Sequence, residues 1–141
     1  HLTFIGSGPL KFDLTGYKNI FVKQVPYTKI PSELNRADIF CLPSCTTKTW
    51  EEQYGMCLVE AMACGLPVIT TLVGLIPDIA KDGENTMLTG WKPEEMAAKI
   101  STLLGDGESQ KKFSVAGIEL VKNFEKKSAI KNYADKLQEL I

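Results

Sequence analysis

Short apolar runs alternate with helical segments along the chain, and this alternation is what most limits the folds open to it. The runs, each bounded by turn or polar residues, fall at residues 2–5, 20–22, 39–42, 67–70 and 87–88. Helices are expected at residues 31–36, 56–64, near Pro77, from Pro93 to a break at 105–107, at 108–123 and from Ser128 onwards. Strands alternating with helices through short connections form βαβ units. We therefore expect an α/β fold, a Rossmann-like parallel sheet with helices on both faces.

Size and charge exclude several classes of protein. A length of 141 residues suits about one domain, residues 1–141, with carboxyl-terminal helices over about 93–141. With 16 Lys+Arg against 17 Asp+Glu, the net charge of -1 gives no electrostatic footprint for nucleic acid. No apolar run approaches the ~18 residues of a membrane span. No signal-peptide pattern begins the chain, and we expect a cytoplasmic location.

Residue types that often carry chemistry are expected here to serve packing. The four cysteines are poorly spaced for a disulfide scaffold and are expected as free core thiols in a reducing compartment: Cys41, Cys45, Cys57 and Cys64. Trp50 and Trp91 are likewise expected to pack. The single histidine is His1, and no Asp-x-Asp pair occurs, so we expect no metal site and no His-assisted nucleophile.

The stretch most informative about chemistry is an apolar helix that holds one ionisable residue. Residues 56–64 are apolar apart from Glu60, and Gly65 follows as a helix stop. Since an unpaired buried carboxylate costs several kcal/mol, Glu60 must face water, a partner or a ligand. Its two oxygens suit the cis-diol of a ribose. A place at the solvent edge of a packed helix is the plain alternative.

The amino end of this helix is a second candidate. Gly55 opens the helix, and the free N–H groups of a first turn favour an anion or a sugar hydroxyl. Glu52 can project over the same end, or can only complement the helix dipole, which is worth about 0.3–1 kcal/mol. Gly6 and Gly8 after the first strand form a weak phosphate signal, for which an ordinary turn is the alternative. Lys11 stands where a dinucleotide fingerprint needs Gly.

These residues resemble the signature of the group 1 (family 4) glycosyltransferases. The signature runs from Glu52 to Glu60 with Tyr54-Gly55 inside it, and continues to Val68. The segments that agree with the family in order and spacing are 4–10, 36–44, 73–74, 82–85 and 93–95. The resemblance implies a GT-B enzyme with two Rossmann-like domains. This chain is then the carboxyl-terminal, donor-binding half, truncated at its amino-terminal side.

The resemblance also implies an activity. Such enzymes move a sugar from a nucleotide-diphosphate donor to a hydroxyl acceptor, with retention and without metal or cofactor. By position, Glu52 is implied to be the catalytic residue that contacts the hydroxyls of the donor sugar. The groups implied to bind sugar hydroxyls and diphosphate are the N–H groups around Tyr54, Gly55, Met56 and Cys57, with Gly6 and Gly8 nearby. Glu60 is implied to bind the ribose and the backbone of Val25 the base.

Several departures from the family bear on what this chain does alone. Leu75, Asp78, Thr86 and Lys92 stand where the family has Gly, Glu, Gly and a capping Asp. The family's phosphate-binding Arg and Lys, on a unit upstream of Leu2, and its amino-terminal acceptor domain are expected as partners. We therefore expect the 141-residue chain not to catalyse transfer alone, and any peripheral membrane contact to be made through the acceptor domain.

Two other classes of function compete with this interpretation. A non-catalytic nucleotide-binding or interaction domain would keep the fold but need neither Glu52 nor Glu60. Half of a dinucleotide-dependent oxidoreductase is disfavoured because the third Gly of its fingerprint is absent.

Overall fold

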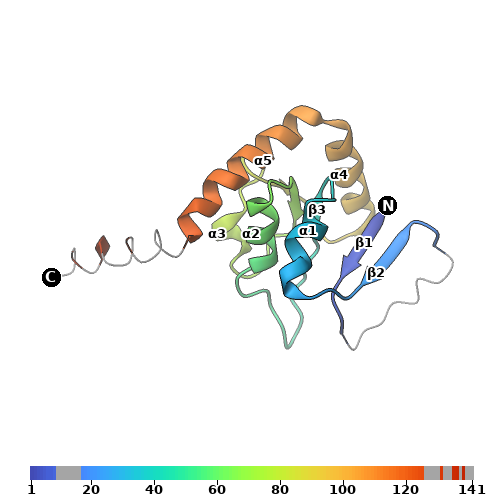
Figure 1. Ribbon diagram of the computed structural model, residues 1–141, viewed down its shortest axis with the longest axis horizontal. Coiled ribbons are helices and arrows are strands. Elements are labelled where there is room, and N and C mark those ends of the chain that lie inside the picture. The colour runs from blue at the N-terminus through green and yellow to red at the C-terminus, as the bar shows by residue number, and fades with distance from the viewer. Residues whose placement is uncertain (9–16, 126–130, 132–134, 137, 139–141) are drawn as a thin grey trace.

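The computed structural model describes residues 1–8, 17–125, 131, 135–136 and 138 (Figure 1). The strands are β1 (Leu2–Ile5), β2 (Ile20–Lys23), β3 (Phe40–Leu42), β4 (Val68–Thr70) and β5 (Met87–Leu88). The helices are α1 (Ile30–Leu34), α2 (Met56–Ala63), α3 (Ile76–Ile79), α4 (Pro93–Gly105) and α5 (Gly107–Val121), with 3-10 turns η1 (Tyr27–Lys29) and η2 (Lys122–Phe124). These elements lie where the apolar pattern predicts them. The helix expected from Ser128 falls largely outside the described residues.

The described strands pair in parallel, which confirms the expected α/β class, but they are divided between two sheets. One sheet has the order β1-β2 and the other β3-β4-β5. The register pairs Leu2 with Ile20 in the first sheet, and Ile69 with both Cys41 and Met87 in the second. The segment η1–α1 connects β2 of the first sheet to β3 of the second. β3 pairs with β4 and forms one edge of the second sheet.

Helices cover both faces of the three-stranded sheet, as expected. Alternate residues of a strand point to opposite faces, and the fully buried β4 shows this directly. Val68 packs in a core cluster with side chains of α1, α2 and α3. Ile69 packs in a second cluster with Leu103 of α4 and Phe113 of α5. Figure 1 shows α4 and α5 running along the outside of the sheet.

Two glycines set how α2 ends and how α5 packs on it. Gly65 adopts φ 73°, and its N–H donates to the Met62 carbonyl at 2.9 Å, so the predicted helix stop is confirmed. Gly117 of α5 lies against Met62, because a Cβ built there would be 3.1 Å from Met62 Cγ. Glycine at this position therefore lets α5 approach α2 closely.

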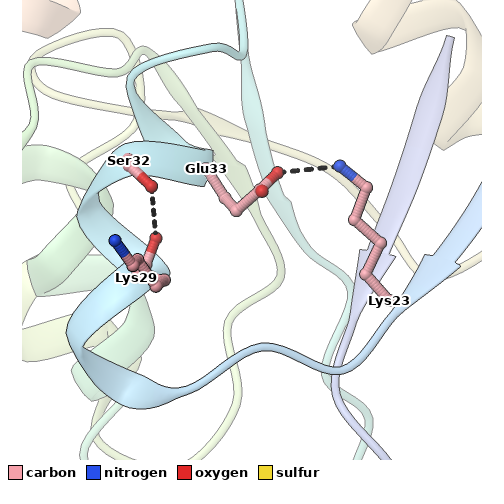
Figure 2. A network of polar contacts seen from close by, with 4 residues as sticks. All are labelled: Lys23, Lys29, Ser32 and Glu33. Atoms are coloured by element: carbon pink, nitrogen blue, oxygen red, sulfur yellow. Dashed lines mark hydrogen bonds and ion pairs between the residues drawn. The ribbon is translucent and has the colours of Figure 1, made fainter.

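An ion pair links the end of β2 to α1, on either side of the turn η1. Lys23 Nζ of β2 lies 2.9 Å from Glu33 Oε2 of α1, and Figure 2 shows the two side chains reaching toward each other. Within the segment, Ser32 Oγ donates to the Lys29 carbonyl at 2.9 Å (Figure 2). The hydrogen bond from Lys23 lowers the pKa of Glu33. The turn η1 is thus fastened on both sides.

The predicted packing of the two tryptophans is wrong. Trp50 is 52% exposed and Trp91 is 73% exposed. Both lie in loops, between β3 and α2 and between β5 and α4, and such connecting segments run over the protein surface. The four cysteines are free, as expected, but they are partly buried and not core residues, and only Cys41 and Cys64 pack against the core clusters. Burial raises the pKa of the Cys41 thiol.

Candidate functional site

Five of the predicted sugar and diphosphate residues gather at the carboxyl ends of β3 and β4. Glu52, Tyr54 and Gly55 lie in the loop between β3 and α2, and Met56 and Cys57 begin α2. In open α/β sheets, ligands bind in the crevice outside this end of the strands. The fold therefore places this group where such a sheet presents its ligand site.

The Glu52 carboxylate is held against the start of α2. Its Oε1 accepts from the Gly55 N–H at 3.1 Å, and its Oε2 accepts from Ser44 Oγ at 3.2 Å. Gly55 is buried and left-handed with φ 56°, so the chain turns back at this point to meet the carboxylate. Glu52 thus stabilises the helix end, and the same two bonds orient its side chain.

The first turn of α2 offers N–H groups to a ligand. The Gly55 carbonyl already accepts from the N–H of Leu58 at 2.8 Å. The N–H groups of Met56 and Cys57, at the first two helical positions, have no carbonyl partner within the helix. Together with the helix dipole they favour an anion at this end.

The Cys57 thiol is a neutral neighbour of this site. Burial raises its pKa, and the negative charge of Glu52 raises it further, against the opposing effect of the Leu58 and Cys57 N–H groups. A thiol with a raised pKa stays protonated at neutral pH and is a poor nucleophile. Cys57 therefore adds no competing negative charge at the helix start.

Gly74, in the loop after β4, packs against the backbone of Glu52. In the sequence, this glycine was identifiable only through the resemblance to the family. Gly74, between β4 and α3, has φ 58°, and a Cβ built on it would lie 1.6 Å from the Glu52 carbonyl oxygen. Thr71 Oγ1 donates to the Ser44 carbonyl at 2.5 Å in the same region. The loops that follow β3 and β4 are therefore in direct backbone contact.

Glu60 lies further along α2 and is paired with a residue that sequence reasoning missed. Its Oε1 accepts from the Tyr27 hydroxyl at 2.7 Å. This bond, and then the charge of Glu60, raise the pKa of Tyr27. Tyr27 opens η1 two residues after Val25, the expected base contact. The sequence offered one indication of this role, which is that a tyrosine follows closely after the expected base contact in the run Val25-Pro26-Tyr27.

Gly6 and Gly8 stand apart from these groups. They follow β1, and the Gly6 N–H donates to the Lys23 carbonyl at the end of β2, at 2.9 Å. A Cβ built on either glycine meets nothing within 4 Å, so both face open space. Within the described ranges, no hydrogen bond or ion pair joins either glycine to α2. The Gly6 bond extends the pairing of β1 with β2 by one residue.

The surface around the site is partly apolar. Five large side chains in or next to the two loops are exposed: Trp50, Tyr54, Met56, Leu72 and Leu75. A hollow of about 610 Å³ opens beyond Leu72, between β5 and α4, and a second of about 400 Å³ lies at the opposite end of α2. Neither hollow is lined by Glu52 or Glu60.

In the described part of the chain, no group of three or more His, Cys, Asp or Glu side chains is arranged to hold a metal ion. None of the helices described is both long enough and apolar enough to cross a bilayer.

Comparison with known proteins gives consistent matches. Residues 13–120 match the family described as Glycosyl transferases group 1. The chain is 31% identical over 136 residues to a sulfoquinovosyl transferase of Arabidopsis thaliana, covering 91% of this chain and 26% of that protein. It is 31% identical over 105 residues to a D-inositol 3-phosphate glycosyltransferase of Corynebacterium diphtheriae, covering 74% of this chain and 23% of that protein. The chain thus spans about a quarter of the length of these relatives.

Solved structures agree on the fold. The carboxyl-terminal domain of a group 1 family glycosyl transferase (LpcC) from Francisella tularensis is 30% identical with a TM-score of 0.64, covering 76% of this chain and 54% of that one. The Anabaena protein HepE, solved in complex with UDP, has a TM-score of 0.72 at 23% identity, covering 85% of this chain and 32% of that one. The latter likeness is one of fold alone.

Proposed function

The chain belongs to the glycosyl transferases group 1 family, and from that premise we propose that residues 1–141 form one domain that binds a nucleotide-diphosphate sugar for a retaining glycosyltransferase. One observation carries the proposal. Glu52 is fixed beside the start of α2, and Glu60 lies on the same helix next to the Val25 segment. The order sugar, diphosphate, ribose in a donor then runs along α2 from its amino end.

The chemistry proposed for this site is electrostatic. As the bond from sugar to diphosphate breaks, negative charge grows on the diphosphate. The N–H groups of Met56 and Cys57 and the positive end of the α2 dipole face that charge without rearranging. Glu52 keeps a lone pair on each oxygen after its bonds to Ser44 and Gly55, and so accepts hydroxyls of the sugar.

Glu60 is proposed to bind the ribose diol and the Val25 backbone the base, with Gly6 and Gly8 near the nucleotide. The amino-terminal acceptor domain of the longer enzyme is the proposed partner, because the matched part of this chain covers only 26% and 23% of these relatives. We propose that the 141-residue chain binds donor but does not turn it over. The four free thiols fit a cytoplasmic location, where they stay reduced.

Calorimetric titration tests the proposal directly. UDP, GDP and ADP, each with a sugar conjugate such as UDP-glucose, are titrated into the wild-type chain, Glu60→Gln and Glu52→Gln. Glu84→Gln is the matched control, since Glu84 is an exposed acid in the loop before β5. One nucleotide is expected to bind, and Glu60→Gln is expected to weaken it at least tenfold.

The two site variants separate the two subsites. Glu52→Gln is expected to weaken the nucleotide-sugar more than the nucleotide alone, because only the sugar reaches that carboxylate. Unchanged affinity in both site variants, or equal losses in the Glu84→Gln control, would favour the alternative of a non-catalytic nucleotide-binding or interaction domain.

A further inference from the structure

The bond between Tyr27 and Glu60 is unusual for its place on the surface. The Tyr27 side chain is 75% exposed, yet its hydroxyl lies 2.7 Å from Glu60 Oε1. That separation is typical of a charge-assisted O–H···O⁻ hydrogen bond. Such a bond competes with water, so it persists only where the backbone already holds the tyrosine in reach. The segment around Tyr27 meets that condition.

The turn that carries Tyr27 is fixed from both ends. The Lys29 N–H donates to the Pro26 carbonyl at 2.8 Å and closes η1 around Tyr27. The ion pair of Lys23 with Glu33 joins the strand before the turn to the helix after it, as Figure 2 shows. The phenol is therefore presented to α2 by a braced segment and not by a loose loop.

Glu60 depends on this contact for its orientation. In the part of the chain that the structure describes, the Tyr27 hydroxyl is the one hydrogen-bond partner of the Glu60 carboxylate. A glutamate side chain without partners loses rotamer freedom when a ligand binds, and that loss weakens affinity. A bond made before the ligand arrives removes part of this cost.

The bond also leaves room for a ligand. Each carboxylate oxygen has two acceptor positions, and the Tyr27 hydroxyl occupies one of them on Oε1. Oε1 and Oε2 can therefore each still accept one hydroxyl of a vicinal diol. Since Glu60 raises the pKa of Tyr27, the phenol stays protonated and remains the donor at neutral pH.

We propose that Tyr27 is a positioning residue that orients the Glu60 carboxylate toward the ribose diol of the bound nucleotide. This inference rests on the proposed function and deepens it. Tyr27 acts through Glu60, so its hydroxyl affects only ligands that carry the diol.

The test compares UDP with its 2′,3′-dideoxy analogue by calorimetry in the wild type, Tyr27→Phe and Tyr17→Phe. The first variant keeps the ring and removes only the hydroxyl. Tyr17 is a similarly exposed tyrosine, 63% exposed, and its hydroxyl bonds to none of the residues that the structure describes. Tyr27→Phe is expected to weaken UDP about three- to tenfold and to leave the dideoxy analogue unchanged. Tyr17→Phe is expected to change neither.

Other outcomes overturn the inference in distinguishable ways. Equal weakening of both ligands by Tyr27→Phe indicates a structural role only, and unchanged or tighter UDP binding indicates no positioning. If Glu60→Gln abolishes the preference for the diol while Tyr27→Phe does not alter it, the proposed function stands and this inference fails. If the wild type shows no preference for the diol, both fail.

A ligand-free measurement checks the contact by itself. The tyrosinate absorbance of the wild type is titrated with alkali and compared with Glu60→Gln and Tyr27→Phe. Glu60→Gln is expected to move one tyrosine to a lower pKa, and Tyr27→Phe is expected to remove that same transition. Identical titrations of wild type and Glu60→Gln would show that the two side chains do not interact in solution.

Discussion

Substituting Gly74 by alanine tests the contact that closes the site, and Gly83→Ala is its matched control. Both glycines are left-handed, with φ 58° and 68°. A Cβ on Gly83 meets nothing within 4 Å, whereas a Cβ on Gly74 would lie 1.6 Å from the Glu52 carbonyl oxygen. Both variants carry the cost of a left-handed alanine, about 1–2 kcal/mol. Only Gly74→Ala carries the clash in addition.

The size of the extra effect follows from the geometry. A close carbon–oxygen contact is about 3.3–3.6 Å, so the two loops must move apart by roughly 2 Å. The bond that joins the two loops, from the buried Thr71 hydroxyl to the Ser44 carbonyl, then exceeds hydrogen-bonding range. Leaving a buried hydrogen-bonding group without its partner costs about 1–3 kcal/mol. We expect Gly74→Ala to lower the free energy of unfolding by about 2–5 kcal/mol in total.

Urea denaturation followed by tryptophan fluorescence gives the free energy of unfolding of both variants and of the wild type, and Trp50 lies in the affected loop. Titration of UDP-glucose into the folded variants gives the affinity of the site for the nucleotide-sugar. Gly74→Ala is expected to weaken the nucleotide-sugar strongly, and Gly83→Ala to leave its affinity unchanged. Equal destabilisation of the two variants, within about 0.5 kcal/mol, would refute the backbone contact.

Three other perturbations test contacts elsewhere. Asn85→Ala removes a buried amide that bonds two backbone groups, and we expect a loss of about 2–3 kcal/mol by urea denaturation; a loss below about 0.5 kcal/mol would contradict it. Gly117→Leu drives a side chain into Met62, so the thermal midpoint should fall by several degrees, and an unchanged midpoint would mean that α5 does not pack there. Lys23 lowers the pKa of Glu33, so the pair stabilises the fold above about pH 4.3 and this contribution disappears as the pH falls through the lower folded-state pKa. Lys23→Met should flatten the acid limb of the profile of stability against pH, and an unaltered limb would argue against the pair.

Local features of the fold were predictable from the sequence because they depend on neighbouring residues. The strands follow short apolar runs between turn residues, and α2 ends where Gly65 supplies a left-handed φ. The parallel pairing was also predictable from the alternation of strands and helices, because parallel strands need a long crossover connection, usually a helix. The division into two sheets was not predictable in this way, because it depends on which strand β3 meets after η1 and α1.

The candidate site was predictable in its residue types and less so in its contacts. Glu52, Gly55 and Glu60 were recognised from their spacing around the start of one helix. The partners of these residues come from elsewhere: Tyr27 lies 33 positions before Glu60, and Gly74 comes from the loop after β4. Such pairs depend on the path of loops, which local sequence preferences do not determine. Exposed Trp50 shows the same limit, since its type alone favoured packing.

The position of β4 between two core clusters has a consequence for how the molecule opens. Because its successive side chains belong to different clusters, neither cluster can come apart without disturbing β4. Its backbone amides should therefore be among the last to exchange with deuterated solvent. β1 and β2 contribute to neither cluster, so their amides should exchange through smaller openings. A nucleotide held by both parts would slow exchange in β1 and β2 more than in β4.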